Sequence, residues 1–192
     1  MDDRVDTQLI SRIRDGLRER ADPVKAPQMQ RYMKSEMPFL GIQKPGRVAL
    51  ARELRGAPVS PATVLALWRE ATYREERYMA LLLLERIPPE MALLPVYEEL
   101  IVTGAWWDLV DPVATGPLGA LLPDVADTLR AWSVDANLWK RRASIIAQVK
   151  RRERTDFELL KECIEPNRGD REFFISKAIG WALRSYAWVN PE

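Results

Sequence analysis

Two stretches decide the fold: RYMALLLLE at residues 77–85 and WKRRASIIAQV at residues 139–149 each read as one strongly apolar helix. WWDLVDPVA at 106–114 and EFFISKAIGWAL at 172–183 have the same character, and the four stretches start about 30 to 35 residues apart. Each is preceded by another predicted helix. Two-helix units at this period are typical of an α-solenoid of the HEAT type, in which each pair buries its apolar face against the next.

Helical spacing continues over the rest of the chain. Apolar residues three and four apart, with helix starts such as Ser60-Pro61 and Pro123-Asp124, predict helices throughout, while the alternation and turn pairs of β-hairpins are absent. We therefore expect an all-α fold built as one domain over residues 1–192. The predicted helices are 6–20, 47–54, 61–70, 74–87, 90–102, 107–114, 124–132, 137–150, 157–164 and 171–188.

Composition excludes several kinds of protein and site. No apolar run is long enough to cross a bilayer, and the start, MDDRVDTQLI, lacks the pattern of a signal peptide, so we expect a cytoplasmic protein without membrane contact. The chain has no histidine and one cysteine, Cys163. These two facts argue against an intramolecular disulfide, a zinc site and any Ser/His or Cys/His catalytic pair. Catalysis would have to use carboxylates, Lys, Tyr, Ser or Thr, or electrostatics alone.

The net charge of +1 hides a separation of charges along the sequence. Residues 87–128 contain seven acidic residues and no Lys or Arg, whereas residues 139–154 contain seven basic residues and only Glu153 as an acid. Local patches of this kind can attract a charged partner that the net charge would not suggest.

The first candidate site lies in the acidic half. Trp107 and Asp111 are four residues apart, so a helix places them on one face, with Asp108 one turn from Asp111. An aromatic ring and a carboxylate pointing the same way suit a cationic guest. The other interpretation is that the tryptophans belong to the core and the aspartates are solvated or capping.

The basic half supplies the second candidate. Arg142 follows Trp139 by three residues, which predicts that the arginine leaves the helix beside the tryptophan, and Lys150 is expected two turns further along the same helix. Arg and Lys side chains bind phosphates, and an arginine can also hold a carboxylate. A solvated basic face would give the same spacing.

Two further segments carry weaker signals. Phe174, Lys177, Trp181 and Arg184 form one stripe of aromatic and cationic residues on a helix, where Gly180 suggests close approach of another helix or backbone. A core stripe is the alternative. Residues 30–45 are too irregular for a continuous helix, and 40–45 predict a packed loop that leads into a helix at Gly46.

Together these segments resemble the AlkD family of DNA alkylation-repair glycosylases. The resemblance rests on RYMKSEMPFLGIQKP (31–45), ELIVTGAWWDLVD (99–111), NLWKRRASIIAQVK (137–150) and EFFISKAIGWALRSYA (172–187), which cover most of the chain in the family's order. It implies a HEAT-like solenoid with a concave DNA-binding face. It also implies hydrolysis of the N-glycosidic bond of cationic alkylated purines, such as 7-methylguanine and 3-methyladenine, in double-stranded DNA during base excision repair.

The resemblance assigns roles to seven residues. Asp111 corresponds to the catalytic carboxylate, Trp107 and Trp181 to the aromatics that flank the lesion nucleotide, and Arg142 to an active-site arginine. Tyr32, Lys150 and Phe174 correspond to positions that line the site. No cofactor or metal is implied, and we expect a monomer. The sequence ends at Glu192, before the family's last C-terminal helices.

Two other functions fit the same fold. One is a HEAT-like protein that binds DNA without turnover, and the other is a protein-interaction scaffold. The combination of Asp111, Trp107 and Arg142 favours the enzyme, because a scaffold does not need these three residues.

Overall fold

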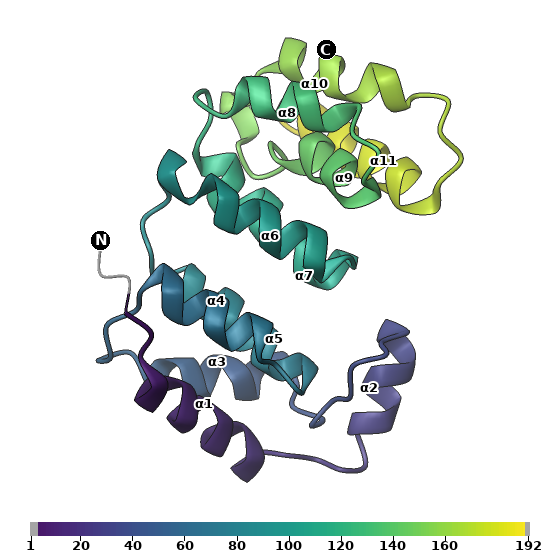
Figure 1. Ribbon diagram of the computed structural model, residues 1–192. Helices are drawn as coiled ribbons and strands as arrows, with labels where there is room; N and C mark the ends of the chain where they lie inside the picture. The colour runs from purple at the N-terminus through teal and green to yellow at the C-terminus, as the bar shows by residue number, and fades with distance from the viewer. Residues whose placement is uncertain (1–3, 191–192) are drawn as a thin grey trace. The chain divides into compact units, whose positions relative to one another are not determined.

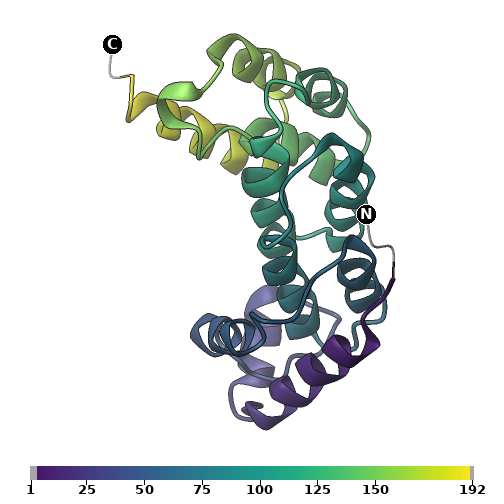
Figure 2. The same ribbon diagram turned by 90° about the vertical axis from the view of Figure 1, so that its left-hand side faces the viewer.

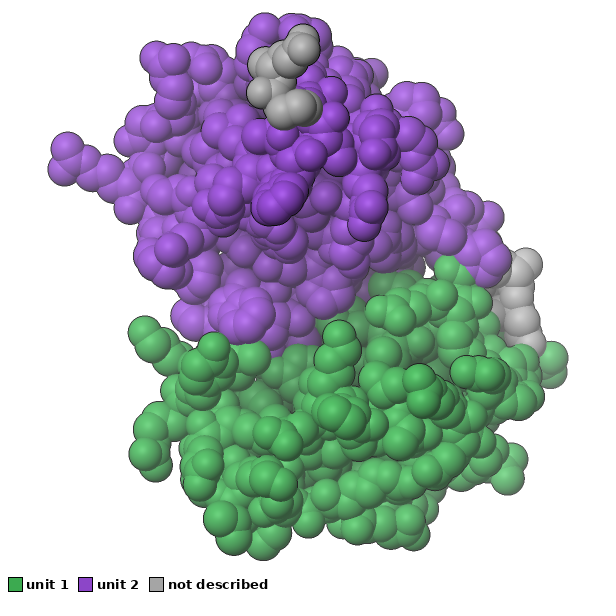
Figure 3. All heavy atoms as spheres, turned by 180° about the vertical axis from the view of Figure 1, so that it is seen from behind, with its two compact units in different colours: residues 1–87 green, residues 88–192 purple. Residues whose placement is uncertain are grey.

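The computed structural model describes residues 4–190, and in that range the chain is helical with no strand (Figure 1). The prediction of an all-α fold is confirmed. The chain divides into two compact units, residues 1–87 and 88–192 (Figure 3), so the expectation of one continuous domain stays a prediction. No helix in the described range is long and apolar enough to cross a membrane.

Unit 1 contains helices α1 to α5. Helix α5 packs against α1, α3 and α4 and supplies much of the core of this unit, with Met79, Leu83 and Leu84 buried. The bounds are α1 Thr7–Glu19, α2 Ala26–Met33, α3 Lys44–Glu53, α4 Pro61–Arg69 and α5 Arg74–Leu84.

A buried carboxylate organises the loop between α2 and α3. Glu75, fully buried in α5, accepts hydrogen bonds from the backbone N–H groups of Leu40, Gly41 and Ile42 at 2.8 to 3.1 Å. Gly41 has a φ of 90°, and a side chain there would collide with the carbonyl oxygen of Asp22. The packed loop predicted for this segment is confirmed, although α3 begins at Lys44 rather than at Gly46.

Unit 2 contains α6 to α11, and α9 is its central helix. It packs against α6, α7, α8, α10 and α11, an arrangement that can be followed in Figures 1 and 2. The bounds are α6 Leu94–Gly104, α7 Trp107–Val113, α8 Ala126–Ser133, α9 Leu138–Ile146, α10 Phe157–Ile164 and α11 Phe173–Ala187, with short helical turns at Met91–Leu93, Ala114–Leu118, Arg152–Arg154 and Glu165–Asn167.

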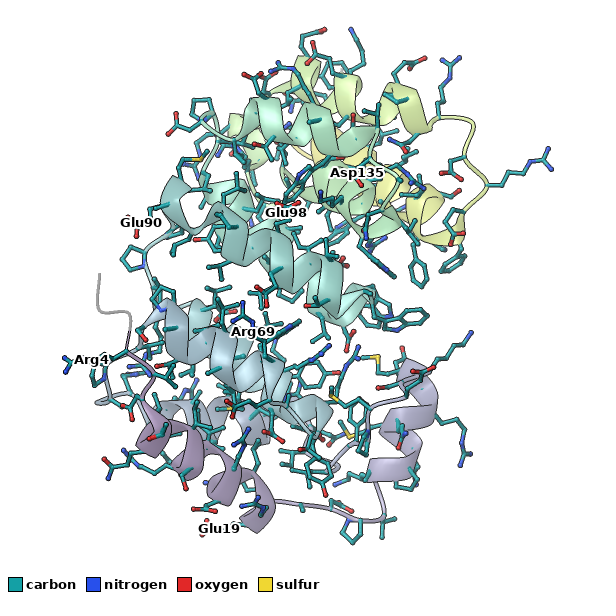
Figure 4. The ribbon with its side chains drawn as sticks, viewed as in Figure 1. Arg4, Glu19, Arg69, Glu90, Glu98 and Asp135 are labelled. Carbon is teal, nitrogen blue, oxygen red and sulfur yellow. The ribbon has the colours of Figure 1, made fainter. Side chains whose placement is uncertain are left out.

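An ion-pair network ties α9 to its neighbours. Lys140 Nζ lies 2.5 Å from a carboxylate oxygen of Glu98 on α6 and 3.1 Å from one of Asp135, which precedes α9 (Figure 4). The Lys140 ammonium also lies over the ring of Trp132 on α8, 5.5 Å from its centroid. The hydrogen bond to Glu98 raises the pKa of Lys140, and burial opposes this only partly. One lysine thus joins elements from two successive helix pairs.

Among the glycines of unit 2, Gly119 makes the closest approach to another backbone segment. An added Cβ at Gly119 would lie 2.2 Å from the carbonyl oxygen of Ala147, so the turn after α7 and the end of α9 touch through glycine. Arg151 Nη1 then donates a hydrogen bond to the Gly119 carbonyl at 3.2 Å.

Gly119→Ala is expected to destabilise the protein by roughly 2 kcal/mol, because overpacking forces backbone shifts where no flexible side chain can yield. Urea unfolding followed by circular dichroism measures the loss. Gly56→Ala is the matched control, because an added Cβ there meets nothing within 4 Å. Equal stability of the two variants would contradict the contact.

Several predicted helix boundaries are wrong, and one helix was not predicted. The helix predicted for 90–102 is split into a short turn and α6, since Pro95 stands where a helix can begin. The helix predicted for 107–114 continues into the widened turn Ala114–Leu118. The helix predicted for 137–150 ends at Ile146, and α2 was not predicted at all.

The single cysteine is buried in α10. Cys163 is 1% exposed, and burial raises the pKa of its thiol to about 12. A thiol reacts as the thiolate, so Cys163 is unsuited to nucleophilic chemistry near neutral pH.

Candidate active site

The candidate site is built on α7, α9 and α11 of unit 2. Helix α7 begins at Trp107 and carries Asp111 one turn later, while α9 carries Arg142 and α11 begins at Phe173. Both α7 and α11 pack against α9. Residues more than thirty positions apart in the sequence therefore meet around one arginine.

Arg142 binds the carboxylate of Asp111 through two parallel hydrogen bonds. Its Nε donates to Oδ1 at 2.9 Å and its Nη2 donates to Oδ2 at 2.8 Å. The side chains are 7% and 14% exposed, respectively. A two-point fork of this kind fixes both the position and the plane of the carboxylate. Asp111 is thus oriented before any ligand arrives.

Arg142 is itself held by the start of α11. Its Nη1 donates to the carbonyl oxygen of Phe174 at 2.6 Å, and its guanidinium lies 5.9 Å from the centroid of the Phe174 ring. All three terminal groups of the arginine therefore have acceptors. The guanidinium bridges α7 and α11 and has little freedom to move.

An aromatic cluster packs beside this bridge. The rings of Trp106, Trp139 and Phe174 lie 5.0 to 5.9 Å apart, centroid to centroid, and Phe173 meets Phe174 edge-on at 5.3 Å. Aromatic pairs at such distances add to the energy of burial. The Nε1 of Trp106 is buried with no hydrogen-bond partner, which indicates that this ring contributes packing rather than a polar contact.

Burial and the arginine act in opposite directions on Asp111. Burial raises the pKa of the Asp111 carboxyl, an effect that the two hydrogen bonds and the positive charge of Arg142 oppose, and the nearby Asp108 adds to the increase. The net pKa is above the ordinary value of an aspartate. A perturbed carboxyl of this kind is characteristic of functional sites, although structural ion pairs can also produce one.

The other predicted residues are placed as follows. Trp107 and Trp181 are half-buried in unit 2, the latter on α11 two turns after Phe174 and hence on a similar face. Lys150 is exposed in the turn after α9, not on the helix, because α9 ends at Ile146. Tyr32 is in unit 1, on α2, and is 77% exposed.

The structure thus brings together Asp111, Arg142 and Phe174 from the predicted set. Trp106 is not among the predicted site residues, and Trp139 is predicted only as a neighbour of Arg142. Both tryptophans are visible in the sequence at 106–107, but helical spacing places only Trp107 on the same face as Asp111. Among residues 4–190, no group of three or more Cys, Asp or Glu side chains is arranged to hold a metal ion.

Comparison with known proteins supports a single family. The family model described as DNA alkylation repair enzyme matches residues 13–192. The chain belongs to this DNA alkylation repair family. Among solved structures, a predicted DNA alkylation repair enzyme from Enterococcus faecalis is 32% identical, with a TM-score of 0.77 over 90% of this chain and 86% of that chain. A comparison with curated proteins found no match.

Membership of this family confirms the resemblance and, with the helical structure, the α-solenoid class of fold. It also implies an enzyme of DNA repair that interacts with DNA. Asp111, Arg142 and the aromatic cluster all lie within the matched region.

Proposed function

We propose that this protein is a DNA glycosylase that hydrolyses the N-glycosidic bond of cationic alkylated purines, such as 7-methylguanine and 3-methyladenine, in double-stranded DNA, as a step of base excision repair. The observation that carries the proposal is the pair of hydrogen bonds by which Arg142 holds the carboxylate of Asp111. It orients a carboxylate in advance, one turn after the half-buried Trp107. Family membership supports the choice of DNA as the substrate.

The chemistry requires little beyond a well-placed negative charge. An alkylated purine already carries a positive charge, so its C1′–N bond breaks without a proton donor, and the bonding electrons neutralise the departing base. The sugar left behind resembles an oxocarbenium ion. The Asp111 carboxylate stabilises that charge, water bonds to C1′, and the proton of the water passes to solvent. This reaction does not need a histidine, which the chain lacks.

The neighbouring side chains have supporting roles in this proposal. Trp107 and Trp181 flank the lesion nucleotide with their rings, Phe174 anchors Arg142, and Lys150 and Tyr32 contact DNA. Both Lys150 and Tyr32 are exposed enough to do so. The solenoid would present a concave face to the duplex, act as a monomer and need no cofactor.

Two alternatives are kept for the test. A member of this family could bind DNA without turnover, or use its helical stack to bind another protein. The oriented Asp111 carboxylate favours catalysis over both, because neither needs a half-buried charge.

The proposal is tested by comparing the release of a cationic base with the release of a neutral one. Wild-type protein is expected to release 7-methylguanine from a methylated duplex and to leave uracil in a matched duplex, because uracil departs as an anion and Asp111 is not placed to protonate it. Chromatography of the released bases measures both reactions. Release of neither base would contradict the proposal, and equal release of both would contradict its mechanism.

A further inference from the structure

The seven basic residues of the 139–154 segment fall into two groups in the structure. Lys140, Arg141 and Arg142 each face an acid, since Lys140 pairs with Glu98 and Asp135, Arg141 with Asp170, and Arg142 with Asp111. The remaining four cations lie in the loop after α9, and none of them forms an ion pair with a described residue. They are Lys150, Arg151, Arg152 and Arg154.

Packing within unit 2 explains only one of the four loop cations. The side chain of Arg151 donates to the carbonyls of Gly119 and Arg154, and so closes the loop against the turn after α7. The side chains of Arg152 and Arg154 are exposed and make no hydrogen bond, ion pair or ring contact within residues 4–190. Burial lowers the pKa of Arg151, the positive charge of Arg154 lowers it further, and the negative charge of Asp156 opposes both only partly.

The backbone of the loop has the form of an anion-binding turn. Arg151 has right-handed helical angles, with φ −80° and ψ −18°, and Arg152 follows with a positive φ of 53°. This succession points consecutive N–H groups into one concavity, which attracts anions. The N–H groups of Arg152 and Glu153 donate to no acceptor in the described chain. An arginine also rarely adopts a positive φ, and no contact of its side chain accounts for it here.

The position of the loop relates it to the candidate site. Helix α9, which carries Arg142, ends at Ile146, about 6 Å further along its axis, and the loop begins four residues after that end. Its short helical turn, Arg152–Arg154, packs against α11, which carries Phe174 and Trp181. The loop and Asp111 therefore belong to the same unit, and the loop packs against a helix of the candidate site.

We propose that the loop 150–154 binds a backbone phosphate of DNA, with the free N–H groups of Arg152 and Glu153 and the side chains of Arg152 and Arg154 as its donors. The inference rests on the proposed function for its ligand, DNA, but not for the reaction. Glu153 is the one acid in the loop, and its own N–H remains available to the phosphate.

The test is the salt dependence of binding to a short fluorescent duplex without lesions, followed by anisotropy. Each phosphate contact contributes about 0.9 to the slope of log K against log salt. The double variant Arg152→Gly/Arg154→Gln is expected to lower that slope by about 1 to 2 and to weaken binding roughly 10-fold near 100 mM salt. Glycine accepts the positive φ, so the fold should persist, and thermal unfolding checks this.

The matched control removes two positive charges elsewhere in the same unit. Lys161 and Arg168 are exposed and paired with Glu158 and Glu165, so Lys161→Gln/Arg168→Gln should leave the slope unchanged. An unchanged slope in the loop variant, an equal change in the control, or no binding of DNA by the wild type would overturn the inference. A lower slope in the loop variant, together with no base release by the wild type, would support phosphate binding by the loop and reject the glycosylase activity. The two proposals can therefore be separated.

Discussion

Asp111→Asn is expected to lower the single-turnover rate of 7-methylguanine release by about 10²–10³-fold, with DNA binding almost unchanged. The amide keeps the size of the carboxylate and one acceptor oxygen for Arg142, but it removes the negative charge that opposes the developing charge on the sugar. Losses of this size are typical when one electrostatic contact to a transition state is removed. Quenched time courses on a methylated duplex, with enzyme in excess, measure the rate.

Asp108→Asn provides the matched control, because it makes the same chemical change one turn from Asp111 on the same helix. Its rate should stay within about tenfold of the wild type, since Asp108 acts on Asp111 only through its charge. If the two variants were equally slow, the carboxylate held by Arg142 would have no special role. If both matched the wild type, Asp111 would not take part in the chemistry.

Arg142→Met has the largest expected effect on stability, a loss of about 3 to 5 kcal/mol. Without the guanidinium, the carboxylate of Asp111 remains half-buried with no opposing charge, and the carbonyl of Phe174 loses its donor. Methionine retains much of the apolar contact with the aromatic cluster, so the loss reports mainly on the charge. Urea unfolding at neutral pH gives the free energy of unfolding.

The double variant Asp111→Leu/Arg142→Met separates charge from packing. Because it leaves no unpaired charge inside, it should be more stable than Arg142→Met alone, as is often found when a buried ion pair is replaced as a whole. A double variant that is less stable than Arg142→Met would mean that Arg142 stabilises the protein through its volume and not through its charge.

How much of the fold the sequence predicts depends on burial. Helix α10, Phe157–Ile164, matches its predicted range, because Leu159, Leu160, Cys163 and Ile164 form a regular buried stripe. Helix α2 has no buried residue, so its sequence has no apolar stripe from which a helix could be predicted. It depends on local contacts such as the hydrogen bond from the N–H of Ala26 to the carbonyl of Asp22.

The sequence also does not show which glycine allows close approach of another element. Gly180 was expected to permit close approach of another element, but an added Cβ there would meet only the flexible end of Arg184, at 3.3 Å. In unit 2 it is Gly119 that lies against another backbone segment, at Ala147. Gly119 follows the irregular turn Ala114–Leu118, where no regular apolar spacing marks the contact. Periodicity describes one helix at a time and carries no information about which backbone lies opposite.

The site was predictable in part for a related reason. Helical spacing placed Trp107 with Asp111 and Trp139 with Arg142, and the resemblance added their roles. The fork between Asp111 and Arg142 joins residues 31 positions apart, and the acceptor carbonyl on Phe174 is backbone, which side-chain identity cannot reveal. The same holds for the basic segment, where only the structure separates paired cations from the four unpaired ones in the loop.

The most direct measurement of the central claim is the identity of the products from a duplex with one 7-methylguanine, determined by mass spectrometry of the base, the DNA strand and the protein. We expect free 7-methylguanine and a strand with one abasic site in equal amounts. The protein mass should be unchanged, because the Cys163 thiol is buried with a pKa of about 12 and is unsuited to accept a methyl group. Repaired guanine left in the strand, or a methyl group transferred to the protein, would contradict it.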